Sequence, residues 1–312
     1  MVAGRSPIAG RSRAGSVEVA GIELTHPDRI LFADQGLTKR DLATYYVQVA
    51  EAMLPHVVGR PITIVRCPSG RKNKCFYQKH PGSAVPETLK RVTIEEKSGT
   101  HDYLLVSNVR DLVSLVQIGM LEIHLWGARA DDLDHPDRIV FDVDSGPGVA
   151  WKKVTEAAAE LRERLRQMRL ESFLKTTGGK GLHVVVPVAP IDDWSTLKAF
   201  AKAIAVAMEQ DAPDTYTTAL PKAARAGRIF IDYLRNDRGA TAVAPFSTRA
   251  RAGAPVATPL AWTELGPQLR SGDLNVVTVP ERLRTLDADP WKGLLRLHQK
   301  ITAKARAELA LP

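Results

Sequence analysis

Two aspartates separated by one residue stand at the end of an apolar run in the segment RIVFDVDSGPG. In an extended strand, residues i and i+2 lie on one face, so the carboxylates of Asp142 and Asp144 project together. Close carboxylates repel each other unless a cation neutralises them, and Mg²⁺ or Mn²⁺ prefers such oxygen-rich sites. Asp232 lies within the apolar segment RIFIDYL, where a buried acid needs a partner. The three acids predict a two-metal site.

A glycine-rich segment, KTTGGKGLH, adds the groups that hold a polyphosphate. It offers flexible backbone amides, the Thr177 hydroxyl, the Lys180 cation and the His183 imidazole. It is not a Walker A loop, because the spacing differs and the loop opens into a strand rather than a helix. By itself the segment is more typical of a hairpin turn. Beside metal-binding acids it predicts a triphosphate, because metals bridge the phosphate oxygens and cations bind the others.

Two basic regions flank these motifs. Residues 60–79 carry six basic and no acidic side chains, and Phe76 and Tyr77 stand side by side among them. Cations suit the phosphates of a nucleic-acid strand and rings stack on its bases, although a solvated loop whose aromatics cover the core fits equally well. The second region surrounds Asp232, and we expect at least one of its arginines to reach a phosphate. Its members are Arg225, Arg228, Arg235, Arg238, Arg249 and Arg251.

Hydrophobic periodicity predicts the elements that position these residues. We expect a helix over 37–54 capped by Thr38, the strand PITIVRCP, and a helix that runs into a strand ending near His124. After the strand RIVF, a turn at 146–148 precedes a helix over 151–168, and SFLKTT pairs with LHVVVPV through GGKG. The remaining expected elements are a helix over 194–209, the strand RIFIDYL, an ordered loop or hairpin over 240–259, and closing helices over 263–269 and 291–309.

The composition bounds the class of protein. The chain has 312 residues, 44% hydrophobic and 25% charged, so it can bury a sizeable core. Lysine plus arginine number 43 against 35 for aspartate plus glutamate, and the net charge of +8 favours a polyanionic partner. No apolar run approaches the roughly 18 residues of a membrane-spanning helix, and no secretory signal is visible. We therefore expect a soluble protein.

Cys67 and Cys75 are the only cysteines, which excludes a disulfide scaffold and suits a reducing cytosol. A zinc site made of these cysteines with His56 and His80 is not supported, because the spacing is irregular and there is no C-x-x-C pair. We expect the cysteines to be buried as small apolar side chains.

Taken together, these segments resemble the polymerase domain of bacterial DNA ligase D, a branch of the archaeo-eukaryotic primase superfamily. The matching stretches run in family order from about Thr25 to Trp262: HPDRILF with LTKRDLATYY, CFYQKH, MLEIHLWG, RIVFDVDSGPG, KTTGGKGLHVVVP and RIFIDYLRNDRGATAVAPFSTRARAGAPVATPLAW. The resemblance implies an α+β, two-lobed primase-polymerase fold, whose catalytic antiparallel sheet resembles an RNA-recognition fold and is flanked by helices. We expect a flexible tail over 1–16, one two-lobed domain over 17–300, with a mainly DNA-binding lobe over 17–130 and a mainly catalytic lobe over 131–262, and C-terminal helices over 263–312.

The resemblance also implies an activity: template-dependent addition of NTPs or dNTPs to a primer 3′-hydroxyl at DNA gaps or broken ends in non-homologous end joining. Two Mn²⁺ or Mg²⁺ ions are the implied cofactors, on Asp142, Asp144 and Asp232. The family pattern places the nucleotide on His124, Thr177, Lys180, His183, Arg249 and Arg251, a downstream 5′-phosphate on Arg29 and Lys39, and the template base on Phe76 and Tyr77. The implied partners are gapped, overhanging or primer-template DNA, a Ku-like end-binding protein and a ligase, in the bacterial cytoplasm with the nucleoid.

Three positions depart from the commonest family pattern, since Ser145 replaces a proline, Thr177 a serine and Tyr77 a phenylalanine. The hydroxyl and the ring are kept, and no required acid or cation is lost. The sequence contains no ligase or nuclease segment, so a freestanding relative and an excised domain both stay open.

Other functions also stay open. Within the same fold, the chain would be a primase or an excision-repair gap filler. A non-catalytic nucleic-acid-binding module would have little reason to keep three clustered acids. A metal-dependent nuclease would share the acids but would not need a triphosphate loop.

Overall fold

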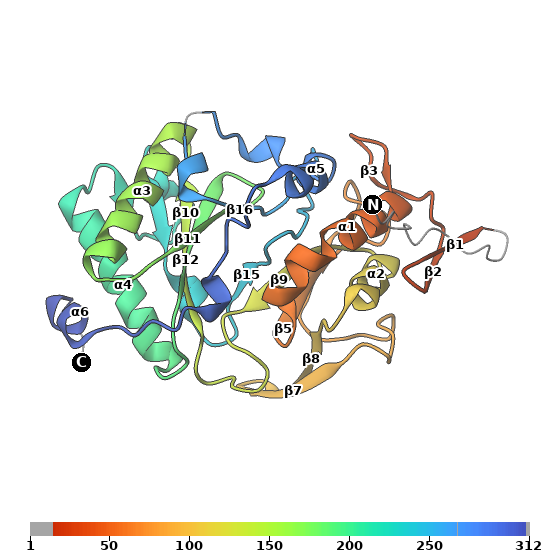
Figure 1. The fold of residues 1–312 in the computed structure, drawn as a ribbon, viewed down its shortest axis with the longest axis horizontal. Helices are drawn as coiled ribbons and strands as arrows, with labels where there is room; N and C mark the ends of the chain where they lie inside the picture. Colours follow the sequence, from red (N-terminus) through yellow and green to blue (C-terminus); the bar gives the residue numbers. More distant parts are fainter. Residues whose placement is uncertain (1–14, 267, 310–312) are drawn as a thin grey trace.

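The computed structural model describes residues 15–266 and 268–309, and its two largest sheets have six strands each (Figure 1). The first sheet has the strand order β15-β9-β5-β8-β7, with β6 paired to β5, and all of its pairs are antiparallel. Its strands are β5 (Pro61–Arg66), β6 (Phe76–Gln78), β7 (Arg91–Glu96), β8 (Gly99–Leu105), β9 (Met120–Trp126) and β15 (Thr241–Val243).

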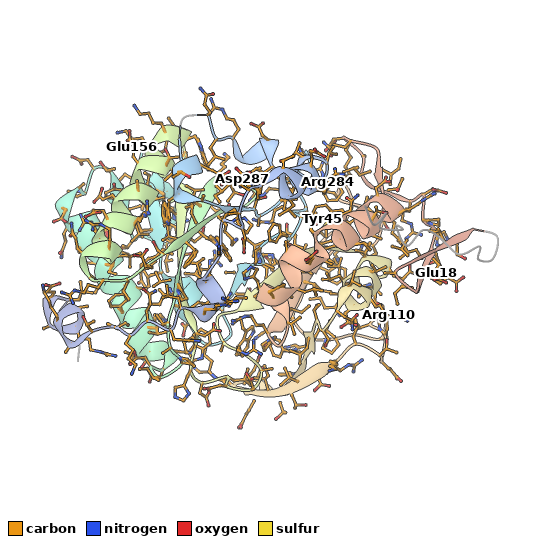
Figure 2. All side chains as sticks on the ribbon, in the orientation of Figure 1. Glu18, Tyr45, Arg110, Glu156, Arg284 and Asp287 are labelled. Carbon is orange, nitrogen blue, oxygen red and sulfur yellow. A yellow bond between two sulfur atoms is a disulfide. The ribbon has the colours of Figure 1, made fainter. Side chains whose placement is uncertain are left out.

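Helices α1 (Lys39–Val57) and α2 (Val109–Gln117) pack on the first sheet. The expected cap of α1 is confirmed, because the Thr38 side chain accepts a hydrogen bond from the Asp41 amide and the Asp41 side chain accepts one from the Thr38 amide. Tyr45 of α1 is buried and donates a hydrogen bond to the Phe246 carbonyl, whereas Glu156 lies on an outer face of the molecule (Figure 2). Two short hairpins precede α1: β1 (Ser16–Val19) with β2 (Ile22–Thr25), and β3 (Ile30–Phe32) with β4 (Leu37–Thr38).

The second sheet has the order β13-β14-β10-β12-β11-β16 and is antiparallel except for the β13–β14 pair. Helices α3 (Trp151–Gln167) and α4 (Trp194–Asp211) cover one face of it (Figure 1). Burying each large apolar side chain of this core, such as Phe200 or Ile204, contributes about 1.5–3 kcal/mol. The strands are β10 (Arg138–Ser145), β11 (Phe173–Thr176), β12 (Gly181–Pro187), β13 (Tyr216–Thr217), β14 (Ile229–Asp232) and β16 (Pro259–Leu260). The α+β class and the antiparallel sheet that carries the acids are confirmed.

One segment that follows the second sheet in the sequence contributes a strand to the first sheet. Strand β15 follows β14 in the sequence but pairs with β9 of the first sheet, so that Val243 lies opposite His124. Phe246 and Val256, farther along the same segment, belong to the core of the first sheet. The expected ordered segment over 240–259 therefore crosses from one sheet to the other. This crossing brings its arginines next to both sheets.

The two closing helices expected over 263–269 and 291–309 do not form as long helices, because only short helical pieces lie there. Between these two ranges, within the expected helical region 263–312, helix α5 (Thr278–Thr285) packs against α1. Gly293 adopts a left-handed φ of 95°, which interrupts helical geometry after Trp291, and Val188 and Gln299 form a parallel bridge in extended backbone. The remaining pieces are 3₁₀ turns η1 (Lys222–Arg225), η2 (Leu234–Asn236), η3 (Trp262–Glu264), η4 (Ser271–Asp273) and η5 (Leu294–Arg296), and helix α6 (Ala303–Glu308).

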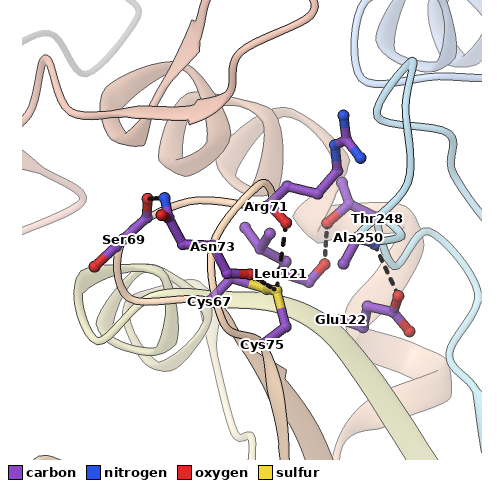
Figure 3. The surroundings of a disulfide bond; sticks show 9 residues. All are labelled: Cys67, Ser69, Arg71, Asn73, Cys75, Leu121, Glu122, Thr248 and Ala250. Atoms are coloured by element: carbon purple, nitrogen blue, oxygen red, sulfur yellow. Dashed lines mark hydrogen bonds between the residues drawn. A yellow bond between two sulfur atoms is a disulfide. The ribbon is translucent and has the colours of Figure 1, made fainter.

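The boundary of the expected N-terminal tail and the state of the two cysteines also differ from expectation. Ser16 belongs to strand β1 rather than to a tail, and residues 1–14 lie outside the described residues. Cys67 and Cys75 form a disulfide rather than two free buried thiols (Figure 3). They flank the Arg66–Phe76 pair of the antiparallel strands β5 and β6, which holds their Cα atoms close together, 4.3 Å apart. In the described part of the chain, no helix is both long and apolar enough to span a membrane.

Candidate active site

A cleft of about 630 Å³ opens between the two sheets. Strands β10 and β12 and the loop before β12 form one side, and Tyr77, His124 and the segment after β15 form the other. The structure therefore brings together residues that the sequence places more than a hundred positions apart. The predicted site residues that line the cleft are Tyr77, His124, Asp142, Asp144, Thr177, Lys180, His183, Arg249 and Arg251.

The three acids lie on adjacent strands of the second sheet. Asp142 is directly opposite Asp232 of β14 on one side and His183 of β12 on the other. Asp142 and Asp232 are each only 6% exposed. The arginine Arg235 bridges them, with its Nη2 atom 3.2 Å from one carboxylate oxygen of each. The acids thus form a buried negative centre that one protein cation partly neutralises.

The acids differ in how readily they hold a proton. Burial, followed by the nearby charge of Asp142, raises the pKa of Asp144 to about 7. Burial also raises the pKa of Asp142, but the neighbouring His183 and Arg235 outweigh it and lower that pKa below its usual value. Burial raises the pKa of Asp232. Burial thus disfavours the simultaneous ionisation of all three acids, and a bound cation would favour it.

The acid centre fits a divalent cation. The Oδ1 atom of Asp142 is buried and lies 3.4 Å from Nε2 of His183, but it accepts no hydrogen bond of good geometry from the described residues, which leaves a lone pair for an ion. The donors are all carboxylate oxygens, the type that Mg²⁺ and Mn²⁺ prefer. The carboxylate oxygens of the three acids are spread more widely than 4.8 Å. Among the described residues, only His80, Glu96 and His101 have ligand atoms that all lie within 4.8 Å of one another. A wider spread suits a two-ion site, because each ion takes only part of the ligand set.

The glycine-rich loop packs beside Asp144. A Cβ atom at Gly181 would lie 2.3 Å from Oδ1 of Asp144, so only glycine fits there. The Thr177 amide and hydroxyl both donate to the Gly181 carbonyl, which closes the turn, and Arg249 donates to the Thr177 carbonyl. Lys180 is exposed at the tip of the loop.

Beneath this loop, His183 and Lys175 are almost fully buried, at 2% exposure each. Burial and the Lys175 charge lower the pKa of His183 to about 4, so that its imidazole is neutral at physiological pH. Within residues 15–266 and 268–309, the Nζ atom of Lys175 has no hydrogen-bond partner, and burial lowers the pKa of Lys175 well below the usual lysine value.

One functional neighbour escaped the sequence analysis. Glu122 accepts hydrogen bonds from His124 at 2.8 Å, from Nε of Arg249 at 3.0 Å and from the Ala250 amide at 2.8 Å (Figure 3 shows the last). Burial alone would raise the pKa of Glu122, but the His124 hydrogen bond and the Arg249 charge lower it to about 2. The only signal in the sequence was its i, i+2 spacing to His124 within LEIH.

The two aromatic residues that we predicted to stack on a template base lie apart. Consecutive residues of a strand face opposite sides, so Tyr77 enters the cleft and Phe76 lines a separate hollow with Ser69 and Lys74. The Tyr77 ring is 64% exposed and its centroid lies 5.3 Å from that of His124.

Arg29 and Lys39 lie outside the cleft but close to each other, because the Lys39 amide donates to the Arg29 carbonyl. The Arg29 side chain is exposed. Lys39 is 3% exposed, and its Nζ atom donates to the Thr25 carbonyl at 2.9 Å and the Gln117 carbonyl at 3.2 Å. Burial and the Arg29 charge lower the pKa of Lys39 to about 8.

Comparison with known proteins identifies the family. The chain is 35% identical over 306 residues to the multifunctional non-homologous end joining protein LigD of Pseudomonas aeruginosa, a match that covers 98% of this chain and 36% of that protein. It is 36% identical over 252 residues to the protein of the same name from Mycolicibacterium smegmatis, covering 80% of this chain and 33% of that protein. The chain thus spans about a third of the length of these relatives.

A solved structure agrees with these matches. The polymerase domain from Mycobacterium tuberculosis ligase D, in complex with DNA, superposes with a TM-score of 0.82 and 33% sequence identity. The superposition covers 88% of this chain and 98% of that one. Residues 38–291, which include both sheets and every residue of the cleft, match the family described as LigD, primase-polymerase domain, and the chain belongs to that family.

Proposed function

We propose that this chain is a template-dependent nucleotidyltransferase that adds NTPs or dNTPs to a primer 3′-hydroxyl by two-metal catalysis. One observation supports this proposal above all: in a single cleft, the buried Asp142 and the partly buried Asp144 face the cations Lys180 and Arg249. An acid centre alone would serve a nuclease equally well. The nearby cations offer binding for the phosphates of a nucleotide, which a hydrolase acting on a DNA strand does not need.

Each residue has a proposed role. Asp142, Asp144 and Asp232 would hold two Mn²⁺ or Mg²⁺ ions, which in such sites activate the attacking hydroxyl and neutralise the departing pyrophosphate. Lys180, Arg249 and Arg251 would bind triphosphate oxygens, with the Thr177 hydroxyl as a further donor. The neutral His183 imidazole would donate a hydrogen bond without adding charge, and His124, held by Glu122, would orient the sugar. Tyr77 would stack on a base at the mouth of the cleft.

We further propose that the substrate is DNA with gaps or broken ends. The relatives above are named for non-homologous end joining, one solved relative is in complex with DNA, and this chain carries a net charge of +8. Exposed Arg29, supported by Lys39, would bind a downstream 5′-phosphate. Phe76 would contact the template strand from its separate hollow. A Ku-like protein and a ligase would act with this chain on nucleoid DNA in the cytoplasm.

A primase or excision-repair gap filler is the second candidate. One observation favours it: the Lys39 ammonium is nearly buried and already donates to two backbone carbonyls. Binding of a downstream 5′-phosphate would then depend mainly on Arg29, and a primase does not need such binding.

Primer extension on a singly gapped duplex with a downstream 5′-phosphate tests the proposal, with Mn²⁺ and either nucleotide type. We expect extension by the unaltered chain, loss of extension in Asp142→Ala and Asp144→Ala, and normal extension in the control Asp131→Ala, which changes an acid outside the cleft. DNA binding should be retained in all of them. Binding without extension by the unaltered chain would indicate a non-catalytic module, and strand cleavage without pyrophosphate release would indicate a nuclease.

A further inference from the structure

A second group of metal-binding side chains lies outside the cleft. The candidate ligand atoms of His80, Glu96 and His101 all lie within 4.8 Å of one another, and none of the three residues lines the cleft. Each side chain is partly buried. His80 follows strand β6, Glu96 ends β7, and His101 lies in β8, so three separate segments converge at this point.

The register of the β7–β8 hairpin explains the convergence. Ile94 pairs with His101 and Glu96 pairs with Gly99, so Glu96 and His101 lie on one face of the hairpin as diagonal neighbours. It is the inner face, because Ile94 and Tyr103, two residues from Glu96 and His101, are buried. The His80 ring stacks on the His101 ring, with centroids 4.3 Å apart and an angle of 24°.

Each of the three side chains is oriented by a further contact. Nδ1 of His80 lies 3.3 Å from the Asp102 carbonyl oxygen, an acceptor, which places the ring proton on Nδ1 and leaves the lone pair on Nε2. Tyr103 donates its hydroxyl proton to Glu96, and the Ser98 hydroxyl lies 3.1 Å from Nε2 of His101. Histidines that bind metals almost always donate their other ring proton to such an acceptor. The cluster therefore has the supporting contacts of a metal site as well as the ligand types.

We propose that His80, Glu96 and His101 bind one transition-metal ion of the zinc class. Two imidazoles and one carboxylate form the His₂Glu donor set of zinc sites that keep a fourth position for water, whereas Mg²⁺ and Mn²⁺ favour oxygen ligands. Ligands of a tetrahedral zinc ion lie roughly 3.4 Å apart, as its bond lengths of about 2.0–2.1 Å require, so small side-chain rotations would close the cluster around the ion. This site is independent of the proposed catalytic function.

A competing cation already touches the cluster. The Nζ atom of Lys79 lies 2.9 Å from Glu96, and its side chain is 42% exposed. A bound divalent ion would repel this ammonium, which is free to turn into solvent. Removal of the Lys79 charge should therefore tighten metal binding, an effect that would not occur if the histidines only pack against each other.

The proposed ion would join β6 to the β7–β8 hairpin. Among the described strands, β6 pairs only with β5, and it carries the exposed side chains of Phe76 and Tyr77. An ion held between His80 and the hairpin would restrict the segment that follows β6. It would thus stabilise the part of the first sheet that borders the cleft.

Metal titration of the 312-residue chain tests the proposal. To remove the acid centre as a competing site, the titrations use the Asp142→Asn, Asp144→Asn background. We expect one equivalent of Co²⁺ to give the visible absorption of a tetrahedral site, to be displaced by Zn²⁺, and to raise the melting temperature. His101→Phe keeps a ring for stacking, and Glu96→Gln keeps an acceptor for Tyr103. Both should lose this binding.

Two further variants sharpen the result. Lys79→Met should bind Zn²⁺ several-fold more tightly than its parent, and His298→Phe, which changes an exposed histidine outside the cluster, should bind like its parent. Circular dichroism checks that each variant is folded. Equal zinc stoichiometry in the parent, His101→Phe and Glu96→Gln would overturn the proposal, as would the absence of any binding by a folded parent at micromolar zinc.

Discussion

The guanidinium of Arg235 lies beside Asp142, with Nη2 3.2 Å from the carboxylate Oδ2, and the same nitrogen is 3.2 Å from Asp232 across the strand pair. This cation stands where the proposed metal ions would neutralise the acids. The Arg235 side chain is 39% exposed, so it has room to turn away when another cation binds. The acid centre is thus kept together in the free protein by a protein charge.

Arg235→Gln should strengthen Mn²⁺ binding to the free protein. The variant removes a competing positive charge, worth on the order of 1 kcal/mol at this partly exposed position, so we expect the dissociation constant to fall about fivefold. Electron paramagnetic resonance of free Mn²⁺ measures it directly. The control is Arg238→Gln, because Arg238 is similarly exposed at 38% and pairs with Asp134 instead. Unchanged or weaker binding in Arg235→Gln would show that the arginine does not compete with the metal.

Mn²⁺ binding should tighten as the pH rises through about 7. Burial and Asp142 raise the pKa of Asp144 to about 7, so a proton must leave before this carboxylate can ligate an ion. Calorimetry in two buffers of different ionisation enthalpy should detect proton release at pH 6 and less of it at pH 8. The free energy of unfolding should change in the opposite direction. Because the pKa of Asp144 is higher in the folded than in the unfolded protein, its contribution to stability is lost as pH rises from the unfolded pKa of 3.8 through about 7. An Asp144→Asn variant that still releases protons would contradict this assignment.

Glu122→Gln should lower both nucleotide affinity and stability. The change removes the charge that holds His124 and Arg249, and breaking such a buried ionic contact costs about 3–5 kcal/mol. Because the folded pKa of Glu122 is lowered to about 2, its contribution is complete above the unfolded pKa near 4.5 and disappears as pH falls toward 2. Urea unfolding at pH 7 and pH 4 measures the difference, which should shrink at the lower pH. A nucleotide titration shows whether KM rises, and equal stability at pH 7 would refute the role.

Arg29 and Lys39 should respond differently to substitution. Arg29 is exposed, so Arg29→Met should remove the preference for a 5′-phosphorylated gap and leave the melting temperature nearly unchanged. Lys39 is nearly buried and donates to two backbone carbonyls, so Lys39→Met should lower the melting temperature as well. Gel-shift competition between phosphorylated and unphosphorylated gaps measures the preference. Retention of the preference in both variants would place the phosphate elsewhere.

The pH dependence of that preference gives a separate check. Burial and Arg29 lower the pKa of Lys39 to about 8, so the charge that attracts phosphate should decline between pH 7 and pH 9 in the unaltered chain. For folding, a lysine with a lowered pKa costs stability while it is charged, and stability recovers as pH rises from about 8 toward the usual lysine value of about 10.4. Lys39→Gln should show a flat profile, and a flat profile in the unaltered chain would exclude Lys39 from the phosphate site.

Local patterns in the sequence were sufficient for much of the catalytic sheet. The i, i+2 spacing of Asp142 and Asp144 in β10, the glycine turn before β12 and the Thr38 cap of α1 each depend on residues a few positions apart. Such features report backbone geometry that neighbouring residues impose by themselves. The same reasoning failed for the segment after residue 262, where Gly293 and extended backbone replace the expected helix.

The acid pair and most strands and helices could be predicted from the amino-acid sequence, because they follow from short-range periodicity. The tertiary structure was needed to show that distant segments meet, as Glu122 does with Arg249 and His80 with the β7–β8 hairpin. It also showed that pairing of β5 with β6 brings Cys67 and Cys75 together. These meetings depend on strand register and on the crossing of β15 to the first sheet. Strand register is set when a whole face of a sheet packs against the hydrophobic core. This packing depends on many residues at once, so no short stretch of sequence is enough to predict it.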